Sequence, residues 1–260
     1  IMITSTGSSQ VKHVLGLLSK AKERREYGEY VVEGIRMVSE VPSSDLVKIY
    51  ISESFSKNCE YKYDKAITEV VSDNVYNHMS DTKTPQGIMA VVKMKRYTLS
   101  DVLGKDRKGS APLVLCVENL QDPGNLGTII RMGEAAGATG VVISSNSVDI
   151  YNPKTIRSTM GSIFRVPYVI AGSFTDTLGQ LQKEGVKLYA AHLKGSSDYT
   201  HIDYTGGTAF LIGNEGNGLT SQAVSAADCL VKIPMSGEVE SLNAAIACTV
   251  LAFEAARQRR

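Results

Sequence analysis

Six short apolar runs in the second half of the chain constrain its fold more than any other feature of the sequence. None of these runs alternates apolar with polar residues, and helical segments fall between most of them. Strands that are covered by helices on both faces have this pattern. The sequence therefore predicts an α/β fold with a mainly parallel sheet. The expected strands are residues 113–117, 141–144, 166–170, 187–191, 209–213 and 230–233.

The last helix expected in this half is unusual. It spans residues 242–256 and is apolar nearly all round, so it needs cover on every side, from its own domain or from a second subunit. The other expected helices are residues 126–136, 153–164, 174–184 and 221–227.

The first 95 residues show a different pattern, in which short helices and strands are mixed. This predicts a compact α/β domain over residues 1–95. Residues 96–112 are polar, contain two glycines and lack periodicity, which is typical of a linker, and residues 113–260 form the second domain. In the first domain the expected helices are 9–26, 34–41, 54–61 and 72–81, and the expected strands are 30–33, 47–52 and 88–93.

Composition narrows the class of protein. Lys and Arg number 28 against 27 Asp and Glu, a net charge of +1, so any nucleic-acid site must come from local clusters of basic residues. The four cysteines form no C-x-x-C pair, which favours buried thiols in a reducing compartment over a metal site or a disulfide. No apolar run approaches about 18 residues, and the start lacks the features of a signal peptide. These observations predict a soluble, cytoplasmic protein that uses no membrane and no metal.

Two basic clusters are candidates for contacts with RNA phosphates. The first lies in the helix expected at 9–26, where Glu23 is the only acidic residue between Lys12 and Arg25, and the second lies between residues 151 and 167, a stretch without an acidic residue. Each alone could be a solvated face, and the two together favour a phosphate track. The clusters are Lys12, Lys20, Lys22, Arg24 and Arg25, and then Lys154, Arg157 and Arg165.

Three segments have the residues for chemistry, and the first, motif 1, covers residues 118–131. A strand ends, an Asp-Pro-Gly turn follows, and Asn125 can cap the next helix. Arg131 lies six residues further on, where it could return toward the same strand edge. A capped helix with a surface arginine explains motif 1 equally well.

Motif 2 is the glycine-rich stretch at residues 213–219. Its three glycines let backbone approach a ligand closely, and Glu215 places a carboxylate between them. The spacing is not that of a G-x-G-x-x-G dinucleotide motif, and a glycine-rich turn is the alternative interpretation.

Motif 3, residues 233–243, joins the last strand to the last helix. It contains Ile-Pro-Met from Ile233 and Ser-Leu-Asn from Ser241. Ser241 stands where the helix needs an N-cap, and capping alone could explain it. Asn243 is harder to explain in this way, because asparagine is a poor helix former.

Taken together and in this order, the three motifs resemble those of the TrmH/SpoU-type RNA 2′-O-ribose methyltransferases of the SPOUT superfamily. The resemblance covers residues 113–260, and stretches 30–36 and 85–88 are similar to the family's amino-terminal substrate-binding domain, which resembles ribosomal protein L30e. It implies a SPOUT-type domain with a deep trefoil knot, a homodimer, and a smaller L30e-like α/β domain that binds structured RNA.

The resemblance also implies the chemistry, which is methylation of a ribose 2′-hydroxyl of RNA with S-adenosylmethionine as cofactor. Arg131 would orient the 2′-hydroxyl and its phosphate, because a guanidinium stays protonated and is a poor base. The general base stays unassigned. The implied catalytic residues are Asn125, Arg131, Glu215, Ser241 and Asn243, and the implied cofactor residues are Leu211, Gly213, Gly218, Ile233, Met235 and Leu242.

Other functions compete with this one. A SPOUT protein that methylates a base nitrogen is disfavoured by the ribose-type motif set, and a non-catalytic RNA-binding or assembly factor is disfavoured because Arg131 and Glu215 are both present. The L30e-like extension favours ribosomal RNA over tRNA as the substrate. The sequence names no nucleotide, and it neither includes nor excludes a role in antibiotic resistance.

Overall fold

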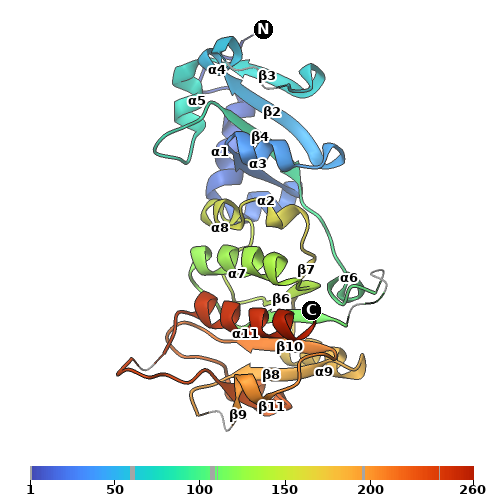
Figure 1. Cartoon of the computed structure of the whole chain (residues 1–260). Coiled ribbons are helices and arrows are strands. Elements are labelled where there is room, and N and C mark those ends of the chain that lie inside the picture. Colours follow the sequence, from blue (N-terminus) through green and yellow to red (C-terminus); the bar gives the residue numbers. More distant parts are fainter. Residues whose placement is uncertain (1, 59–61, 106–108, 110, 195–196, 240) are drawn as a thin grey trace. The chain divides into compact units, whose positions relative to one another are not determined.

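The computed structural model describes residues 2–58, 62–105, 109, 111–194, 197–239 and 241–260, which form two compact units (Figure 1). The first unit consists of Ile1–Lys95 and Asp149–Phe164, and the second of Arg96–Val148 and Arg165–Arg260. The sequence places residues 149–164 in the second domain, whereas in the structure they belong to the first unit. In the described part of the chain, no helix has both the length and the apolar character needed to cross a membrane.

The described residues of the second unit form a seven-stranded sheet in which every neighbouring pair of strands is parallel, in the order β7-β6-β5-β10-β8-β11-β9. The predicted parallel sheet is confirmed. Only the two-residue edge strand β9 was not expected, since it is too short to carry an apolar run. The strands are β5 (Leu113–Val117), β6 (Gly140–Ser144), β7 (Tyr168–Ala171), β8 (Lys187–Ala191), β9 (Ser197–Asp198), β10 (Thr208–Ile212) and β11 (Cys229–Lys232).

Helices cover this sheet on both faces, which explains why the inner strands β5, β6 and β10 are buried along their whole length. Val114 and Cys116 of β5 belong to a buried cluster with side chains of α6, α9 and α10. Leu115, which points the other way, lies against Gly133 of α7, and α7 packs beside α11. The helices are α6 (Leu99–Val102), α7 (Pro123–Ala136), α9 (Phe174–Lys183), α10 (Ser221–Ala226) and α11 (Ala244–Gln258).

The segment expected to be a linker is partly structured. Residues 99–102 form α6, which begins with a capping box between Thr98 and Asp101, and Val102 and Leu103 are buried. A Cβ on Gly140 would lie 2.6 Å from the Cα of Val102, so α6 packs directly on β6. A single turn of helix is too short to show a period, and for this reason the sequence does not reveal it.

The first unit contains a four-stranded mixed sheet with the strand order β1-β4-β2-β3 in its described residues. Strand β4 pairs antiparallel with both β1 and β2, and β3 pairs parallel with β2. The strands are β1 (Glu29–Glu33), β2 (Leu46–Ser52), β3 (Thr68–Val71) and β4 (Ile88–Lys93), and the helices from residues 1–95 are α1 (Ser9–Ser19), α2 (Ala21–Tyr27), α3 (Ile35–Glu40), α4 (Glu53–Asn58) and α5 (Asp73–Met79).

The single helix expected at residues 9–26 is two helices, separated by the extended residue Lys20. Arg24 stabilises the break, because its guanidinium donates to the carbonyl oxygens of Leu17 (2.6 Å) and Leu18 (3.3 Å) at the end of α1. These carbonyls lack helical partners when α1 stops, so the arginine satisfies them.

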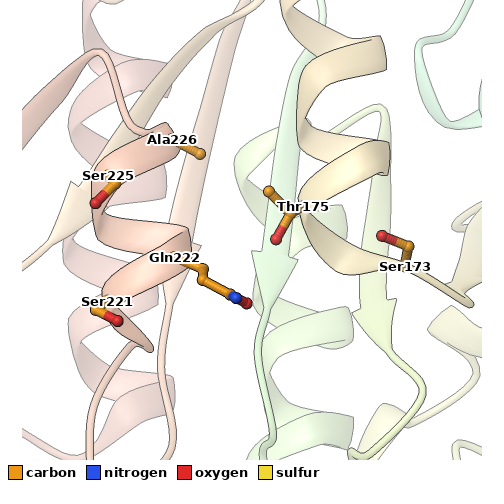
Figure 2. A pocket seen from close by; sticks show the side chains of 6 residues that line it. All are labelled: Ser173, Thr175, Ser221, Gln222, Ser225 and Ala226. Atoms are coloured by element: carbon orange, nitrogen blue, oxygen red, sulfur yellow. The ribbon is translucent and has the colours of Figure 1, made fainter.

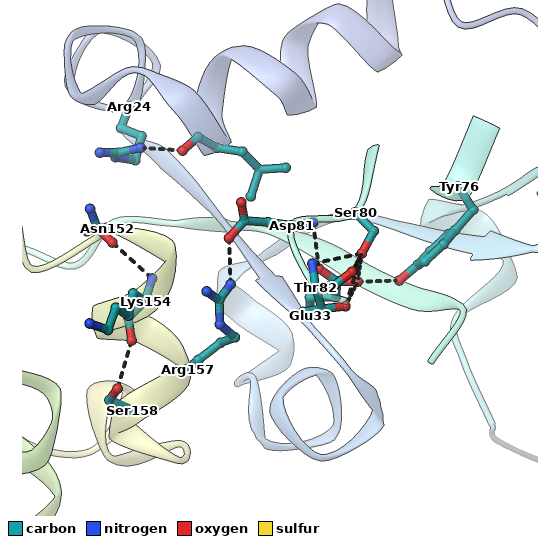
Figure 3. A network of polar contacts seen from close by, with 11 residues as sticks. Arg24, Glu33, Tyr76, Ser80, Asp81, Thr82, Asn152, Lys154, Arg157 and Ser158 are labelled. Carbon is teal, nitrogen blue, oxygen red and sulfur yellow. Dashed lines mark hydrogen bonds and ion pairs between the residues drawn. The ribbon is translucent and has the colours of Figure 1, made fainter. Parts of the chain in front are cut away.

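Helix α8 (Pro153–Thr159), from residues 149–164, packs against β1 in the first unit. Arg24, which is 4% exposed, forms an ion pair with Asp149 (2.7 Å), and Arg157 forms one with Asp81 (2.6 Å; Figure 3). The first unit is therefore built from two separate stretches of chain.

Candidate active site

The three motifs meet at one edge of the parallel sheet. In such a sheet the carboxyl ends of all strands lie at the same edge, and motifs 1, 2 and 3 follow β5, β10 and β11. Strands β5 and β10 are neighbours, and β8 lies between β10 and β11. The topology thus places motifs 1 and 2 side by side. His192 follows β8 directly and therefore lies between motifs 2 and 3.

Motif 1 begins with a tight turn and continues as α7. Asn119 has a positive φ of 54°, and the Asp122 side chain accepts a hydrogen bond from the backbone N–H of Asn125 (2.8 Å). Asp122 is therefore the N-cap, with Pro123 at the first helical position. The expectation that Asn125 caps the helix is wrong, and its side chain is left available for other contacts.

Motif 2 folds back on itself. The backbones of Asn214 and Gly218 exchange two hydrogen bonds of 3.0 and 2.9 Å, and a Cβ on Gly213 would lie 2.1 Å from the Gly218 carbonyl carbon. No side chain fits at residue 213. The Asn214 side chain also donates to the carbonyl oxygen of Asn119 (2.7 Å), which fastens motif 2 to motif 1.

Glu215 connects the same two motifs through its carboxylate. It accepts hydrogen bonds from the backbone N–H groups of Gln121 (3.2 Å) and Asp122 (3.1 Å) and from the side-chain amide of Asn125 (3.0 Å). Partial burial on its own would raise the pKa of Glu215. The hydrogen bonds, from Asn125 first, outweigh burial and hold this pKa below its usual range.

Asn243 brings motif 3 into the same network. It is the N-cap of α11, accepting from the backbone N–H groups of Ala245 and Ile246, and its amide nitrogen donates to Asn125 Oδ1 (3.0 Å). Ser241, predicted to be the cap, is exposed and precedes it by two residues. A continuous chain of hydrogen bonds therefore runs from Asn243 through Asn125 to Glu215 and joins all three motifs.

Arg131 lies on α7, exposed, two turns beyond the cap. Its guanidinium has no hydrogen bond or ion pair with any residue that the structure describes. It is thus available for a ligand, although the structure does not join it to the chain of hydrogen bonds.

The predicted cofactor residues differ in accessibility. Leu211 is fully buried in the core of the second unit and lies beneath the edge rather than at it. Gly218 is exposed, with a positive φ of 68°. The other residues of this set are half-buried: Gly213, Ile233, Met235 and Leu242.

Sequence reasoning missed Glu118, the residue directly after β5. It is 6% exposed, and its two carboxylate oxygens accept from the backbone N–H (2.8 Å) and the hydroxyl (2.7 Å) of Thr220. Glu118 thereby fixes the end of the motif 2 loop, since Thr220 follows Leu219 directly. An acidic residue adjoining an apolar strand, ahead of a turn, was the available signal.

A pocket of about 600 Å³ lies between the first turn of α9 and the length of α10 (Figure 2). It is lined by small polar side chains, including Ser173, Thr175 and Gln222, and none of the lining residues belongs to the three motifs.

The predicted basic clusters are partly used for internal contacts. Lys20 forms an ion pair with Glu23, Arg165 with Glu134, and Arg157 with Asp81. Arg24 is buried, whereas Lys12, Lys22, Arg25 and Lys154 are exposed. Arg165 belongs to the second unit and the other seven residues belong to the first, so the structure does not describe Lys154, Arg157 and Arg165 as one cluster.

Two family profiles match this chain, SpoU rRNA Methylase over residues 112–253 and the MRM3-like substrate binding domain over residues 8–90. A relative from Bacillus subtilis, named 23S rRNA (guanosine(2553)-2′-O)-methyltransferase, is 32% identical over 96% of this chain and 97% of its own length. One from Streptomyces viridochromogenes, named 23S rRNA (uridine(2479)-2′-O)-methyltransferase, is 31% identical over 94% of this chain and 88% of its own length.

A similar structure is that of an rRNA methyltransferase from Sinorhizobium meliloti with bound AdoMet. It has a TM-score of 0.85 and 29% identity, and the match covers 99% of this chain and 97% of that one. With its edge of three joined motifs on a parallel sheet, the protein is an RNA methyltransferase. It belongs to the SpoU rRNA methylase family and carries that family's MRM3-like substrate-binding domain, as the resemblance implied.

Proposed function

We propose that this protein transfers the methyl group of S-adenosylmethionine to a ribose 2′-hydroxyl of 23S ribosomal RNA. The observation that carries the proposal is the hydrogen-bonded chain from Asn243 through Asn125 to Glu215, which holds three distant motifs at one sheet edge. Both relatives named above act on a ribose of 23S rRNA, one at a guanosine and the other at a uridine. The proposal therefore specifies the RNA and the ribose oxygen and leaves the nucleoside open.

The residues at the edge suit S-adenosylmethionine, whose sulfonium supplies an electrophilic methyl group when it is bound. In this proposal the loop from Gly213 to Gly218 contributes mainly backbone C=O groups, because the N–H groups of Asn214, Gly216, Asn217 and Gly218 bond within the loop. An apolar surface contacts the adenosyl part of the cofactor. The half-buried side chains that form this apolar surface are Ile233, Met235 and Leu242.

Arg131 orients the ribose in this proposal. A guanidinium has a planar fork of donors that can hold a hydroxyl oxygen and an adjacent phosphate oxygen together. Its freedom from partners among the described residues supports this role. Because arginine stays protonated, it positions the hydroxyl and does not take the proton.

Glu215 acts as a positioning residue rather than as the base. Its lowered pKa makes it a weak proton acceptor, and its oxygens are occupied by motif 1 donors. Asn125 and Asn243 complete the chain of hydrogen bonds, and Ser241 precedes Asn243 by two residues on the loop before α11. The group that accepts the 2′-hydroxyl proton stays unassigned.

The first unit binds RNA in this proposal, in keeping with its match to a substrate-binding domain. Exposed cations of α1, α2 and α8 contact phosphates, whereas the buried Arg24 serves the fold. The phosphate contacts proposed are Lys12, Lys22, Arg25 and Lys154.

We also propose that the protein is a homodimer that buries the outer face of α11. Ile246 is 51% exposed and Phe253 38%, and their spacing of seven residues places them on one face of the helix. Exposing these two apolar side chains to water costs free energy, and packing against the same face of α11 in a second copy would bury them. The family resemblance places this interface beside a trefoil knot, and both features stay predictions.

Incubating the full-length protein with labelled S-adenosylmethionine and unmodified 23S rRNA tests the proposed reaction. We expect label in a nucleotide that resists alkaline hydrolysis, because a 2′-O-methyl group removes the hydroxyl that attacks the neighbouring phosphate. Label in an alkali-sensitive nucleotide would point to base methylation instead. Transfer to tRNA alone would overturn the assignment of the substrate.

A further inference from the structure

A second pocket, of about 430 Å³, opens in the first unit among α3, α4, α5 and the loop before β4. Its lining combines aromatic and apolar side chains with amides and one carboxylate. These residues include Ile35, Phe55, Asp73, Tyr76, Asn77 and Gln86. The three motifs lie in the second unit, and none of the residues that line this pocket belongs to them.

One wall of the pocket is held rigidly from behind. Tyr76 is 1% exposed, and its hydroxyl donates to Glu33 (3.5 Å; Figure 3). The same carboxylate accepts from the hydroxyls of Ser80 (2.5 Å) and Thr82 (3.0 Å), which begin the loop that leads to the pocket. A preformed wall lowers the entropic cost of binding a ligand.

The loop before β4 is fixed by two close approaches. A Cβ on Gly87, whose φ is +85°, would lie 2.8 Å from Phe55 Cβ, and the Gln86 side-chain oxygen accepts from the backbone N–H of Ile35 (2.9 Å). The amide nitrogen of Gln86 is left without a partner among the described residues. The side chain of Asn77 likewise has none there, so both amides are available to a ligand.

Asp73 supplies the negative charge in the pocket. Its oxygens accept from the Ser54 hydroxyl (2.6 Å) and backbone N–H (3.0 Å), and these bonds lower the pKa of Asp73. Each carboxylate oxygen can accept a second hydrogen bond. The pocket can therefore receive N–H donors from a ligand as well as offer amide donors to it.

Cations surround the same pocket. Arg36 follows the lining residue Ile35, Lys57 precedes Asn58 of the lining, and the exposed Lys83 is two residues before Pro85. Arg36 and Lys57 make exposed ion pairs with neighbours on their own helices, and such pairs are weak and exchange readily. All three can contact phosphates.

The exposed apolar side chain of Ile35, the exposed amides, the ionised carboxylate and the neighbouring cations suit an unpaired nucleotide, which has an apolar base face, a polar base edge and anionic phosphates. We propose that this pocket binds one unpaired nucleobase of the substrate RNA, with the flanking phosphates on the cations. The base packs on Ile35, which is 37% exposed, and its polar edge bonds with Asn77, Gln86 and Asp73. The inference rests on the proposed function, because it takes RNA as the substrate.

The test compares Asn77→Ala with a matched control, Asn74→Ala, in the full-length protein. Both asparagines are exposed on α5, but only Asn77 lines the pocket. Affinity for a 23S rRNA transcript, the Kd for S-adenosylmethionine and methyl transfer at saturating RNA are measured separately. We expect N77A and a second variant, Ile35→Ala, to weaken RNA binding by about tenfold, as loss of contacts to one base does. N74A should match the wild type, and cofactor affinity should not change.

Ultraviolet cross-linking of the wild type to the same transcript adds an independent measurement. We expect cross-linked peptides that contain Ile35, Asn77 or Gln86, which are exposed residues of the lining. RNA affinities of N77A and I35A within twofold of the wild type, or cross-links confined to other peptides, would overturn the proposal. If the wild type binds RNA through this pocket but transfers no methyl group, the pocket stands and the proposed reaction fails.

Discussion

Replacing Asn125 with aspartate tests the chain of hydrogen bonds that joins the three motifs. Asn125→Asp keeps the shape of the side chain and can still accept from Asn243. It replaces the donor facing Glu215 with a second carboxylate at an oxygen–oxygen distance close to the present 3.0 Å. One attractive contact thus becomes a repulsive one with almost no change in volume.

The size of the effect follows from that distance. Two unit charges 3 Å apart repel by about 1.4 kcal/mol at the dielectric constant of water and by about 5.5 kcal/mol at an effective value of 20. Because Glu215 is exposed, the lower figure applies. Loss of a hydrogen bond to a charged group adds about 1.5 kcal/mol. We expect a total of about 2–3 kcal/mol, which corresponds to roughly 30- to 150-fold in kcat/KM for RNA methylation.

The pH dependence gives this prediction a distinct signature. In the wild type the lowered pKa of Glu215 contributes stability that is present at neutral pH and lost as pH falls through the folded-state value. In N125D the two carboxylates repel each other, and protonating one relieves the repulsion. The deficit of N125D in thermal unfolding temperature should therefore be greatest near neutral pH and shrink toward about pH 5.

Asn217→Asp is the matched control, since it adds the same charge two residues from Glu215. The Asn217 side chain takes no part in the chain of hydrogen bonds, and it is the backbone N–H of Asn217 that donates to Asn214 Oδ1. Because residue 217 lies in the loop proposed to hold the cofactor, both variants are compared at saturating S-adenosylmethionine, where N217D should remain within about threefold of the wild type. The reasoning is refuted if N125D is as active as N217D, or if its deficit does not depend on pH.

Three further predictions concern other parts of the protein. Arg131→Ala should lower the rate of methyl transfer at least about 100-fold while leaving the S-adenosylmethionine Kd within threefold of the wild type. Arg131→Lys should not restore the rate, because an ammonium lacks the planar fork of donors. Near-wild-type single-turnover rates for the alanine variant would contradict the role of Arg131. Phe253→Glu should convert a dimer into monomers by light scattering, and a monomeric wild type at micromolar concentration would refute the proposed interface. Replacing the three exposed cations Lys12, Lys22 and Arg25 with alanine should reduce the salt dependence of RNA affinity. An unchanged slope of log affinity against log salt concentration would show that these cations do not contact phosphate.

The sheet of the second unit could be predicted from the sequence because its strands carry the information locally. The expected strand 113–117 coincides with β5, which is buried on both faces and apolar from end to end. The expected strand 187–191 coincides with β8, in which an apolar run follows the exposed Lys187. The three motifs could likewise be recognised from the sequence, because the residues of each motif lie close together in the chain.

The helix caps were mispredicted for a physical reason. Asp122, Asn125, Ser241 and Asn243 all have side chains that can cap a helix, so residue type alone does not choose among them. The proline after Asp122 was a usable signal, since proline favours the first helical position. For Asn243 no such signal exists. Its position is set by contact with Asn125, 118 residues away.

Long-range packing was invisible in the sequence for a similar reason. The basic stretch at residues 12–25 looks uniform, yet Arg24 is buried because Asp149 and two carbonyl oxygens surround it. The acidic partner lies 125 residues further along the chain. Charge counting therefore overestimated the free cations on these helices.

The discontinuous make-up of the first unit also bears on how the protein emerges from the ribosome. When residue 95 has been translated, β1 to β4 exist but α8 does not. Arg24 then has no Asp149, and Tyr30 lacks the ring of Tyr151, whose centroid lies 4.6 Å from its own in the folded protein. By the time residue 164 appears, β5, α7 and β6 have already been made. The first unit is therefore completed only while the second is half synthesised, and the nascent chain must keep both partly folded at once.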